Sequence, residues 1–323
     1  MVRNAQGISI LSVRVDFSSR ASHYMLCGWL TRSDIPLTSV PTLVHAGESV
    51  DVLIQIVSGH SPIAKNGRLG VFEHSAECSF IGIQGVADFE VRGGRQIRIW
   101  PAAGAMQKDI EIILSGPAWA TLCHQRGMLP LHASAIVTKG GITAFAGHSG
   151  AGKSTTAALL SSLGYDLVSD DILPVSFNGN SVPGAWPYLR RLKLHDEPIV
   201  ELGLTPTEMV GDKLDKEKYF VRPKRAGDDK WSRLERLYLL EIDPNDTRAS
   251  INRIAGAEAV RALVDQTYHF GFILGSGRFR DHLSFCAQLA SKIAVYRLRR
   301  PRSFGKGKEL GSLICAHLED APM

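Results

Sequence analysis

Four residues near the middle of the chain have the types and spacing of a phosphate-binding loop. Gly147, Gly152, Lys153 and Ser154 satisfy the pattern G-x-x-x-x-G-K-[ST] within the stretch GHSGAGKSTT. In this pattern the glycines let backbone N–H groups approach a phosphate chain, the lysine reaches its outer phosphates, and the serine hydroxyl can hold Mg²⁺. The start of a following helix adds partial positive charge. The residues expected to bind the phosphates are Gly147, Ser149, Gly150, Ala151, Gly152, Lys153, Ser154 and Thr155.

The segments on either side of this loop have the character that such a site needs. Residues 142–146, ITAFA, form a short apolar run typical of a buried strand. Residues 153–164 have the small and apolar spacing of a helix that ends at Gly164. The alternative is a chance glycine turn that only caps a helix, but such a turn does not require a strand directly before it. The context therefore favours the phosphate site.

Two adjacent carboxylates follow the expected helix. Asp170 and Asp171 interrupt the stretch YDLVSDDILPVS, which otherwise has the character of a strand. A strand returning parallel to 142–146 and beside it would bring both acids to the phosphates, because ligands lie at the carboxyl ends of such strands. One acid could bind Mg²⁺ directly or through water, and the other could accept a proton from an attacking hydroxyl. The alternative is a solvated acidic pair at a strand end.

A histidine precedes the strand that pairs with this run. Residues 134–138 and 142–146 are joined by Lys139, Gly140 and Gly141, and this turn predicts an antiparallel hairpin. His132, at the start of the hairpin, should then lie level with the end of 142–146 and close to the phosphates. It could sense or neutralise charge there, or it could be a structural histidine.

Basic residues gather in two further stretches of the sequence. The first lies in 211–230, which we expect to be an exposed loop, and most of its cations should form a solvated face. Lys218 and Arg222 are candidate substrate-binding residues, because YFV beside them could anchor the loop. The second stretch has few aromatic residues, so nucleic-acid binding is not expected. The two stretches hold Lys213, Lys216, Lys218, Arg222, Lys224 and Arg225, then Arg297, Arg299, Arg300, Arg302, Lys306 and Lys308.

The remainder of the chain predicts two domains: a β-rich one over residues 1–120, and a second over 121–323 that carries the loop. A helix is expected over 117–127, a strand over 234–243, helices over 256–269 and 280–292, and a terminal strand over 294–301. The strands expected in the first domain cover 23–30, 42–47, 51–57, 79–85, 89–93, 96–100 and 109–114.

Composition restricts the class of protein further. The net charge of +5 and pI near 9.0 fit an anionic ligand such as a nucleotide. Five scattered cysteines, without a C-x-x-C pair, argue against a disulfide framework or a structural zinc site. The N-terminus lacks the apolar core of a signal peptide, and no apolar run reaches the length of a membrane helix. We expect a cytoplasmic enzyme without a membrane partner, and a homo-oligomer is left open.

Three motifs together resemble a known family. LHASAIV, GHSGAGKS and SDD, in this order and spacing, are similar to the catalytic domain of the bacterial HPr kinase/phosphorylase family over about residues 127–176. The resemblance implies an α/β (α+β) fold, with an HPr-kinase/PEP-carboxykinase-like P-loop domain that contains a mixed sheet. It also implies ATP and Mg²⁺ as ligands and a site that includes His132 and Lys153. By the same resemblance Asp170 would be the general base for a substrate serine, and Asp171 with Ser154 the metal partners.

The chain departs from the HPr-directed enzymes in two places. Thr155 follows the loop serine where those enzymes usually have a glutamate, and no clear copy of their phosphorylase segment lies between Leu202 and Arg236. The reverse reaction is therefore left open. With GGRQIRIWPA and GMLPLHASA before the loop, the whole chain is similar to the HPr-kinase homologues found with lasso-peptide biosynthesis genes.

The resemblance to the lasso-peptide homologues implies a kinase that phosphorylates the C-terminal serine of a precursor peptide. Two other acceptors stay open on the same fold: a small protein of the HPr type and a small molecule. An alternative of another class is a sensor or assembly protein that binds ATP without transferring phosphate.

Overall fold

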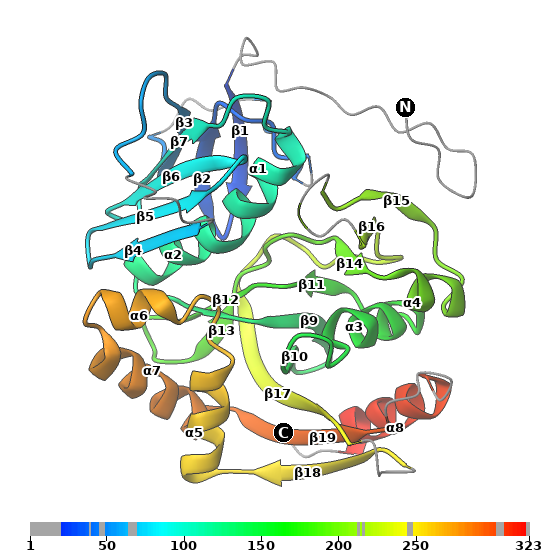
Figure 1. The fold of residues 1–323 in the computed structure, drawn as a ribbon. Helices are drawn as coiled ribbons and strands as arrows, with labels where there is room; N and C mark the ends of the chain where they lie inside the picture. Colours follow the sequence, from blue (N-terminus) through cyan, green and yellow to red (C-terminus); the bar gives the residue numbers. More distant parts are fainter. Residues whose placement is uncertain are drawn as a thin grey trace.

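The computed structural model describes residues 21–38, 40–44, 49–63, 70–211, 214, 217–243, 248–301 and 307–320. It is a mixed α/β structure with a seven-stranded sheet, a nine-stranded sheet and a three-stranded sheet. In Figure 1 the seven-stranded sheet and its helices form the upper part of the view, and the nine-stranded sheet and its helices form the lower part. Within the described residues, no helix is long and apolar enough to cross a membrane.

The N-terminal part is β-rich, as the sequence predicts. Its strands are arranged in the order β1-β2-β3-β7-β6-β5-β4. Apolar residues alternate along them, and Phe89, Val91, Ile97 and Ile99 are fully buried on the face that the helices cover. The strands are β1 (Ser22–Leu26), β2 (Trp29–Ser33), β3 (Val52–Ile56), β4 (Gly70–His74), β5 (Cys78–Ile83), β6 (Ala87–Arg92) and β7 (Gln96–Pro101).

Two helices that meet at a kink cover this sheet. They are α1 (Gln107–Ile113) and α2 (Trp119–Gln125), joined through η1 (Leu114–Ala118), where Gly116 has non-helical φ and ψ. The helix expected over 117–127 is confirmed, but the strand expected over 109–114 is wrong, because Ile110, Ile113 and Leu114 lie at helical spacing and pack into the sheet's core. The strand expected over 42–47 is wrong for 42–44, and 45–47 lie outside the described residues. The domain boundary at 120 stays a prediction.

The nine-stranded sheet follows the order β11-β9-β10-β17-β13-β12-β8, and β19 joins β17 to β18. β10 is parallel to β17, and β17 is parallel to β19. The strands are β8 (Leu129–Leu131), β9 (Ala133–Thr138), β10 (Gly141–Ala146), β11 (Leu167–Ser169), β12 (Leu173–Phe177), β13 (Pro183–Ala185), β17 (Ser232–Ile242), β18 (Ser250–Ile254) and β19 (Ala294–Arg300).

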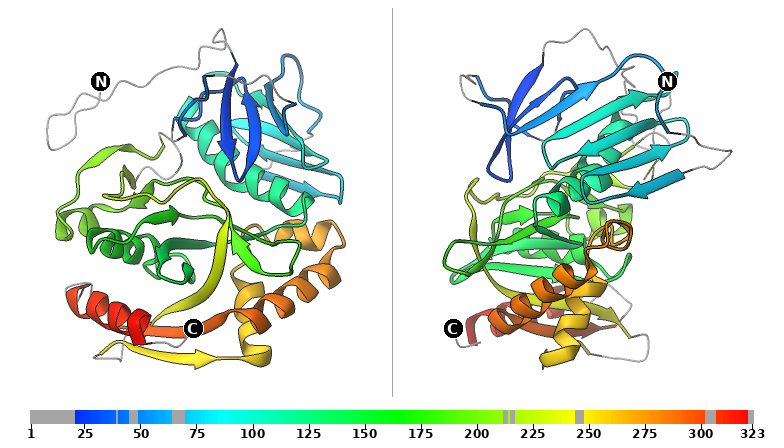
Figure 2. Two further views of the ribbon diagram at one scale, coloured as in Figure 1. Left: turned by 180° about the vertical axis from the view of Figure 1, so that it is seen from behind. Right: turned by 90° about the vertical axis from the view of Figure 1, so that its left-hand side faces the viewer.

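Helices cover both faces of this sheet. On one face α3 (Lys153–Ser162) and α8 (Gly307–Asp320) pack against Phe145 and Tyr238, and on the other α5 (Gly256–Asp265) and α7 (Phe279–Lys292) pack against the alanines of β9 and β10. Figure 2 shows these helices from two further sides. The expected helices are thus present. The strand over 294–301 is not terminal, however, because α8 follows it.

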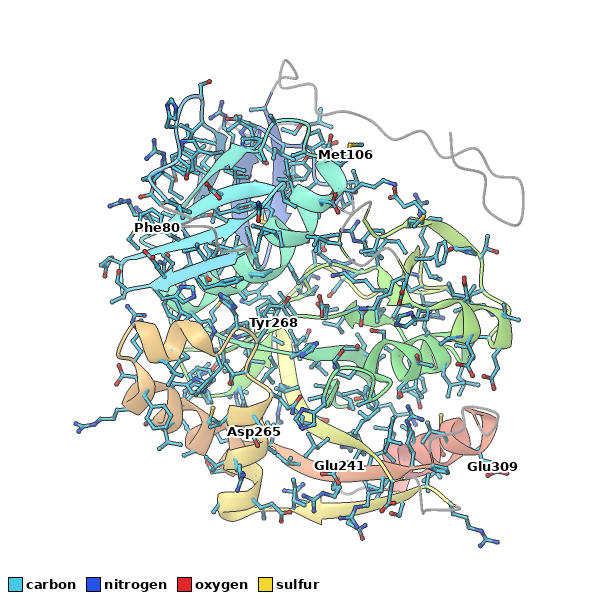
Figure 3. The ribbon with its side chains drawn as sticks, viewed as in Figure 1. Phe80, Met106, Glu241, Asp265, Tyr268 and Glu309 are labelled. Atoms are coloured by element: carbon cyan, nitrogen blue, oxygen red, sulfur yellow. The ribbon has the colours of Figure 1, made fainter. Side chains whose placement is uncertain are left out.

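The three-stranded sheet lies next to α3 and contains β14 (Leu192–Leu194), β16 (Tyr219–Val221) and β15 (Pro206–Met209). Helix α4 (Asp196–Glu201) follows β14, while the short α6 (Gly271–Gly275) contacts β4 of the first sheet. The exposed loop expected over 211–230 is corrected here, because β16 crosses it with Phe220 and Val221 buried. Figure 3 shows Tyr268 between the first sheet and the second.

Candidate active site

The glycine-rich loop connects β10 to α3, as the sequence predicts. Gly150 and Gly152 have φ of 81° and 95°, a left-handed conformation that glycine adopts without the steric penalty of a side chain. The N–H of Gly147 donates to Oε1 of Gln266 at 2.8 Å, and the carbonyl of Gln266 accepts from the N–H of His132 at 2.8 Å. Gln266, which is buried, therefore ties the loop to the strand before the hairpin.

The Lys153 side chain lies across the mouth of the loop. Its ammonium donates to the carbonyl oxygens of Gly147 and His148, at 2.8 and 3.1 Å. Burial lowers the pKa of Lys153, and the carboxylates of Asp171 and Asp170 oppose this effect. Carbonyl contacts of this kind are exchanged easily for a stronger acceptor, so the ammonium is available to an anion at the loop.

A cavity of about 880 Å³ opens beside the loop. Of the residues predicted for the site, those that line it are His132, Ser149, Gly150, Gly152, Lys153, Ser154, Thr155, Asp171 and Lys218. Four predicted residues do not line it: Gly147, Ala151, Asp170 and Arg222. Arg222 is exposed elsewhere, and Lys213 and Lys216 lie outside the described residues.

Asp170 is buried behind the loop and is only 4% exposed. Its Oδ1 accepts from the hydroxyl of Ser134 at 2.5 Å and its Oδ2 from the backbone N–H of Lys193 at 2.9 Å. The hydroxyl of Ser154 lies close enough to this carboxylate to lower its pKa. Burial and the neighbouring Asp171 raise the pKa of Asp170, against the opposing effect of these hydrogen bonds.

Asp171 faces the cavity. Its Oδ2 accepts from the ammonium of Lys193 at 2.9 Å, and its Oδ1 lies 3.4 Å from Nε2 of His132. Burial alone would raise the pKa of Asp171, but Lys193 and His132 hold it well below its ordinary value. The residue has φ of 73°, and an unusual backbone conformation at a cavity wall is a common feature of functional sites.

The strand that directly precedes the two acids, β11, is not the neighbour of β10 in the sheet. β11 pairs with β9 antiparallel, and β9 pairs with β10 antiparallel, so β11 runs parallel to β10 with β9 between them. The expectation of an adjacent parallel strand is therefore wrong. The position expected for His132 agrees with the register, since Ala133 pairs with Ala146 at the end of β10.

Sequence reasoning missed several residues of the cavity wall. Lys193 lies in β14, His195 directly follows this strand, and Glu217 lies two residues before β16. Burial lowers the pKa of Lys193, but Asp171 outweighs this and raises it overall. The stretch LKLHDE holds a signal for Lys193, because a cation between two buried leucines indicates a strand whose lysine points to the opposite face. The other lining residues are Leu194, Glu197, Pro198, Ile242 and Arg300.

The residues of the site fit a nucleotide-bound Mg²⁺ better than a metal held by protein alone. No group of three or more His, Cys, Asp or Glu residues in the described ranges could hold a metal ion. Mg²⁺, however, is usually bound through one or two carboxylates together with substrate phosphates and water. The Ser154 hydroxyl next to the Asp170 carboxylate offers such a partial donor set.

Several solved structures match the chain. No model of a known protein family matches the chain, and no curated protein matches it in sequence. The chain is similar to the HPr(Ser) kinase/phosphatase from Coxiella burnetii, with 13% identity over 58% of this chain and 95% of that chain. The TM-score is 0.30. A function for this chain is therefore argued from its own site.

Proposed function

We propose that this protein is an ATP-dependent kinase that transfers the γ-phosphate to a serine hydroxyl. One observation carries the proposal. Asp171 lines the same cavity as Lys153 and Ser154 of the phosphate-binding loop, and it stands there as a carboxylate fixed by Lys193. A phosphate cradle and an ionised carboxylate that face one cavity are the two parts that phosphoryl transfer to a hydroxyl requires.

The burial of the two acids leads us to exchange the roles expected from the sequence. Asp171 faces the cavity, so we assign it to the acceptor hydroxyl. Asp170 is buried beside the hydroxyl of Ser154, so we assign these two residues to the metal. A bound Mg²⁺ would supply neutralisation of the charge on the phosphate oxygens.

The side chains of the site then act on the transfer as follows. Asp171 orients the serine hydroxyl and takes its proton as the oxygen–phosphorus bond forms and the bond to the departing ADP oxygen breaks. Lys153 leaves its contacts with the carbonyls of Gly147 and His148 and stabilises the transferring group. His132 and Lys193 keep the Asp171 carboxylate in place throughout.

The acceptor class is proposed from the sequence resemblance together with the cavity wall. Lys193 and Lys218 line the cavity on the side of the three-stranded sheet, together with Glu197 and Glu217, so this wall carries both signs of charge and the anionic end of an acceptor peptide would lie beside the lysines. We propose the C-terminal serine of a lasso-peptide precursor as the acceptor and the cytoplasm as the compartment. A protein of the HPr type is the alternative acceptor.

The test is to incubate the pure protein with Mg·ATP and a panel of acceptors, and to measure their intact mass. The panel contains peptides that end in serine, the same peptides ending in alanine, peptides with only an internal serine, and HPr. We expect one phosphate adduct on the peptides that end in serine. An adduct on HPr alone would overturn the acceptor class, and ATP binding without any adduct would point to a sensor instead of a kinase.

A further inference from the structure

The last arginine of β19 differs from its neighbours in its partners. The guanidinium of Arg297 pairs with Glu241 at 2.8 Å, and that of Arg299 pairs with the same carboxylate at 3.4 Å. Glu241 and this strand are seen in Figure 3. Arg300 has no carboxylate partner within the described residues, although it is only 7% exposed. A buried cation without a counter-ion is unfavourable unless an anion meets it in the working state of the protein.

The place of Arg300 in the fold brings it to the phosphate-binding loop. β10, β17 and β19 are neighbours in parallel, so their carboxyl ends lie at the same edge of the sheet. Arg300 ends β19, and its side chain lines the same cavity as Lys153. It therefore reaches the loop from the strand two places away from β10.

The hydrogen bonds of Arg300 leave part of its donor capacity unused. Nε and Nη2 donate to the carbonyl oxygen of Ala151, at 3.2 and 2.9 Å, and Nη1 donates to that of Pro301 at 3.1 Å. A guanidinium has five N–H groups, so one on each terminal nitrogen remains. The loop is shaped around this group, since a Cβ at Gly152 would lie 2.5 Å from Nη2.

We propose that Arg300 binds the phosphate chain of the nucleotide while it holds the loop through the Ala151 carbonyl. This inference rests on the proposed function and adds a second cation to Lys153 at the same phosphates. The planar guanidinium matches phosphate oxygens in geometry and stays charged when buried, which a lysine in this place would not do as readily. Arg300 is thus a ligand-binding residue supplied by the C-terminal strand.

The test measures nucleotide binding by calorimetry on the full chain without an acceptor. The variants are Arg300→Gln, which removes the charge, and Arg300→Lys, which keeps it but loses the fork. Arg299→Gln is the matched control, because this neighbour is half-exposed and paired with Glu241. The ligands are ATP, ADP and AMP, and a melting curve of each variant checks its folding.

We expect Arg300→Gln to weaken ATP binding by about tenfold to a hundredfold, ADP binding less and AMP binding least, since a bidentate charged contact is lost. Arg300→Lys should fall between it and the wild type, and Arg299→Gln should bind like the wild type. Equal losses for all three ligands would indicate that Arg300 only braces the loop, and would overturn the proposal. If Arg300→Gln does not fold, Arg300→Lys takes its place in the test. Its loss of affinity should then be largest for ATP and smallest for AMP, and equal losses would overturn the proposal.

The two proposals fail in different ways. If the wild-type chain binds none of these nucleotides, the proposed kinase function itself is wrong. If the wild type binds ATP and both Arg300 variants bind it with unchanged affinity, only the role of Arg300 is wrong.

Discussion

Lys193 holds both acids of the candidate site, each through a different group. Its ammonium donates to Oδ2 of Asp171 at 2.9 Å, and its backbone N–H donates to Oδ2 of Asp170, also at 2.9 Å. Lys193 belongs to β14 of the three-stranded sheet, whereas the two acids directly follow β11 of the nine-stranded sheet. The site is therefore assembled across two sheets, and the side-chain contact can be removed without the backbone contact.

Lys193→Met should reduce phosphoryl transfer by about tenfold to a hundredfold while nucleotide binding is retained, because it removes one fixed charge at the reacting groups. Lys193 lowers the pKa of Asp171, so its loss lets that pKa rise. The carboxylate is needed in its ionised form, and the acid limb of the kcat profile should therefore move to higher pH. Lys193→Arg is the control that keeps the charge. An unshifted pH profile in Lys193→Met would contradict the pairing.

Asp171→Asn should abolish most of the transfer, with a loss of about 10²-fold to 10⁴-fold in kcat, since general-base contributions have this size. Asparagine tolerates the left-handed backbone at this position, where φ is 73°, so the fold should be kept. Single-turnover phosphate transfer and ATP affinity are measured side by side. Full transfer by this variant would remove Asp171 from the proposed role.

Asp170→Asn should act on stability and metal use in addition to transfer. The carboxylate accepts from the Ser134 hydroxyl and from the Lys193 N–H, and an amide cannot accept through both of its terminal atoms. One buried donor is then unsatisfied, which costs about 1–3 kcal/mol of unfolding free energy. Urea denaturation measures this cost. A titration with Mg²⁺ at fixed ATP should show that the variant needs a higher Mg²⁺ concentration for half-maximal transfer. Unchanged stability together with unchanged metal dependence would reject this assignment.

The central part of the site could be predicted from the sequence because it depends on local pattern. The glycine loop, the hairpin before it and the helix after it are each fixed by residues close together in the chain, such as Gly140, Gly150 and Gly152. The register that brings His132 level with the end of β10 follows from the hairpin turn between β9 and β10 alone. The strand predicted over 109–114 is wrong because a short apolar run fits a buried helix as well as a strand.

The other half of the site depends on contacts between distant segments. Lys193 meets Asp171 only because β14 packs beside α3, and Arg300 reaches the loop only because β19 lies two strands from β10. The different burial of Asp170 and Asp171 is equally a result of tertiary packing. Two adjacent acids look equivalent in a sequence, so their roles cannot be read from it.

Gly152→Ala should weaken ATP binding more than a matched glycine substitution does. Both Gly152 and Gly164 have left-handed φ, of 95° and 103°, so an alanine costs about 1–2 kcal/mol of stability at either position. Only at Gly152 does the added Cβ meet the guanidinium of Arg300, at 2.5 Å, whereas nothing lies within 4 Å at Gly164. Calorimetry with ATP compares the two variants, and equal affinities would show that the loop tolerates the clash.

The stability of the fold should fall in acid because of four histidines, of which His124 and His282 are buried and His74 and His269 are half-buried. Burial lowers the pKa of His124 to about 3 and that of His269 to about 4, and it also lowers those of His74 and His282. His124 is held neutral, with Nε2 donating to the Tyr268 carbonyl at 3.0 Å and its ring stacked on Phe272. Below pH 6.5 these groups are protonated in the unfolded chain before the folded one.

The unfolded state therefore binds more protons, and the unfolding free energy decreases as pH falls below about 6.5. The slope reaches up to about 1.4 kcal/mol per pH unit for His124 down to about pH 3 and for His269 down to about pH 4, and His74 and His282 change it in the same direction. Above pH 6.5 the contribution is complete. Urea denaturation between pH 4.5 and 7.5 measures this slope. His124→Gln should flatten it, because glutamine can donate to the Tyr268 carbonyl but takes up no proton. His60→Gln, at an exposed position, is the control and should keep the wild-type slope. If His124→Gln kept that slope too, protonation of His124 would not be the source of the acid sensitivity.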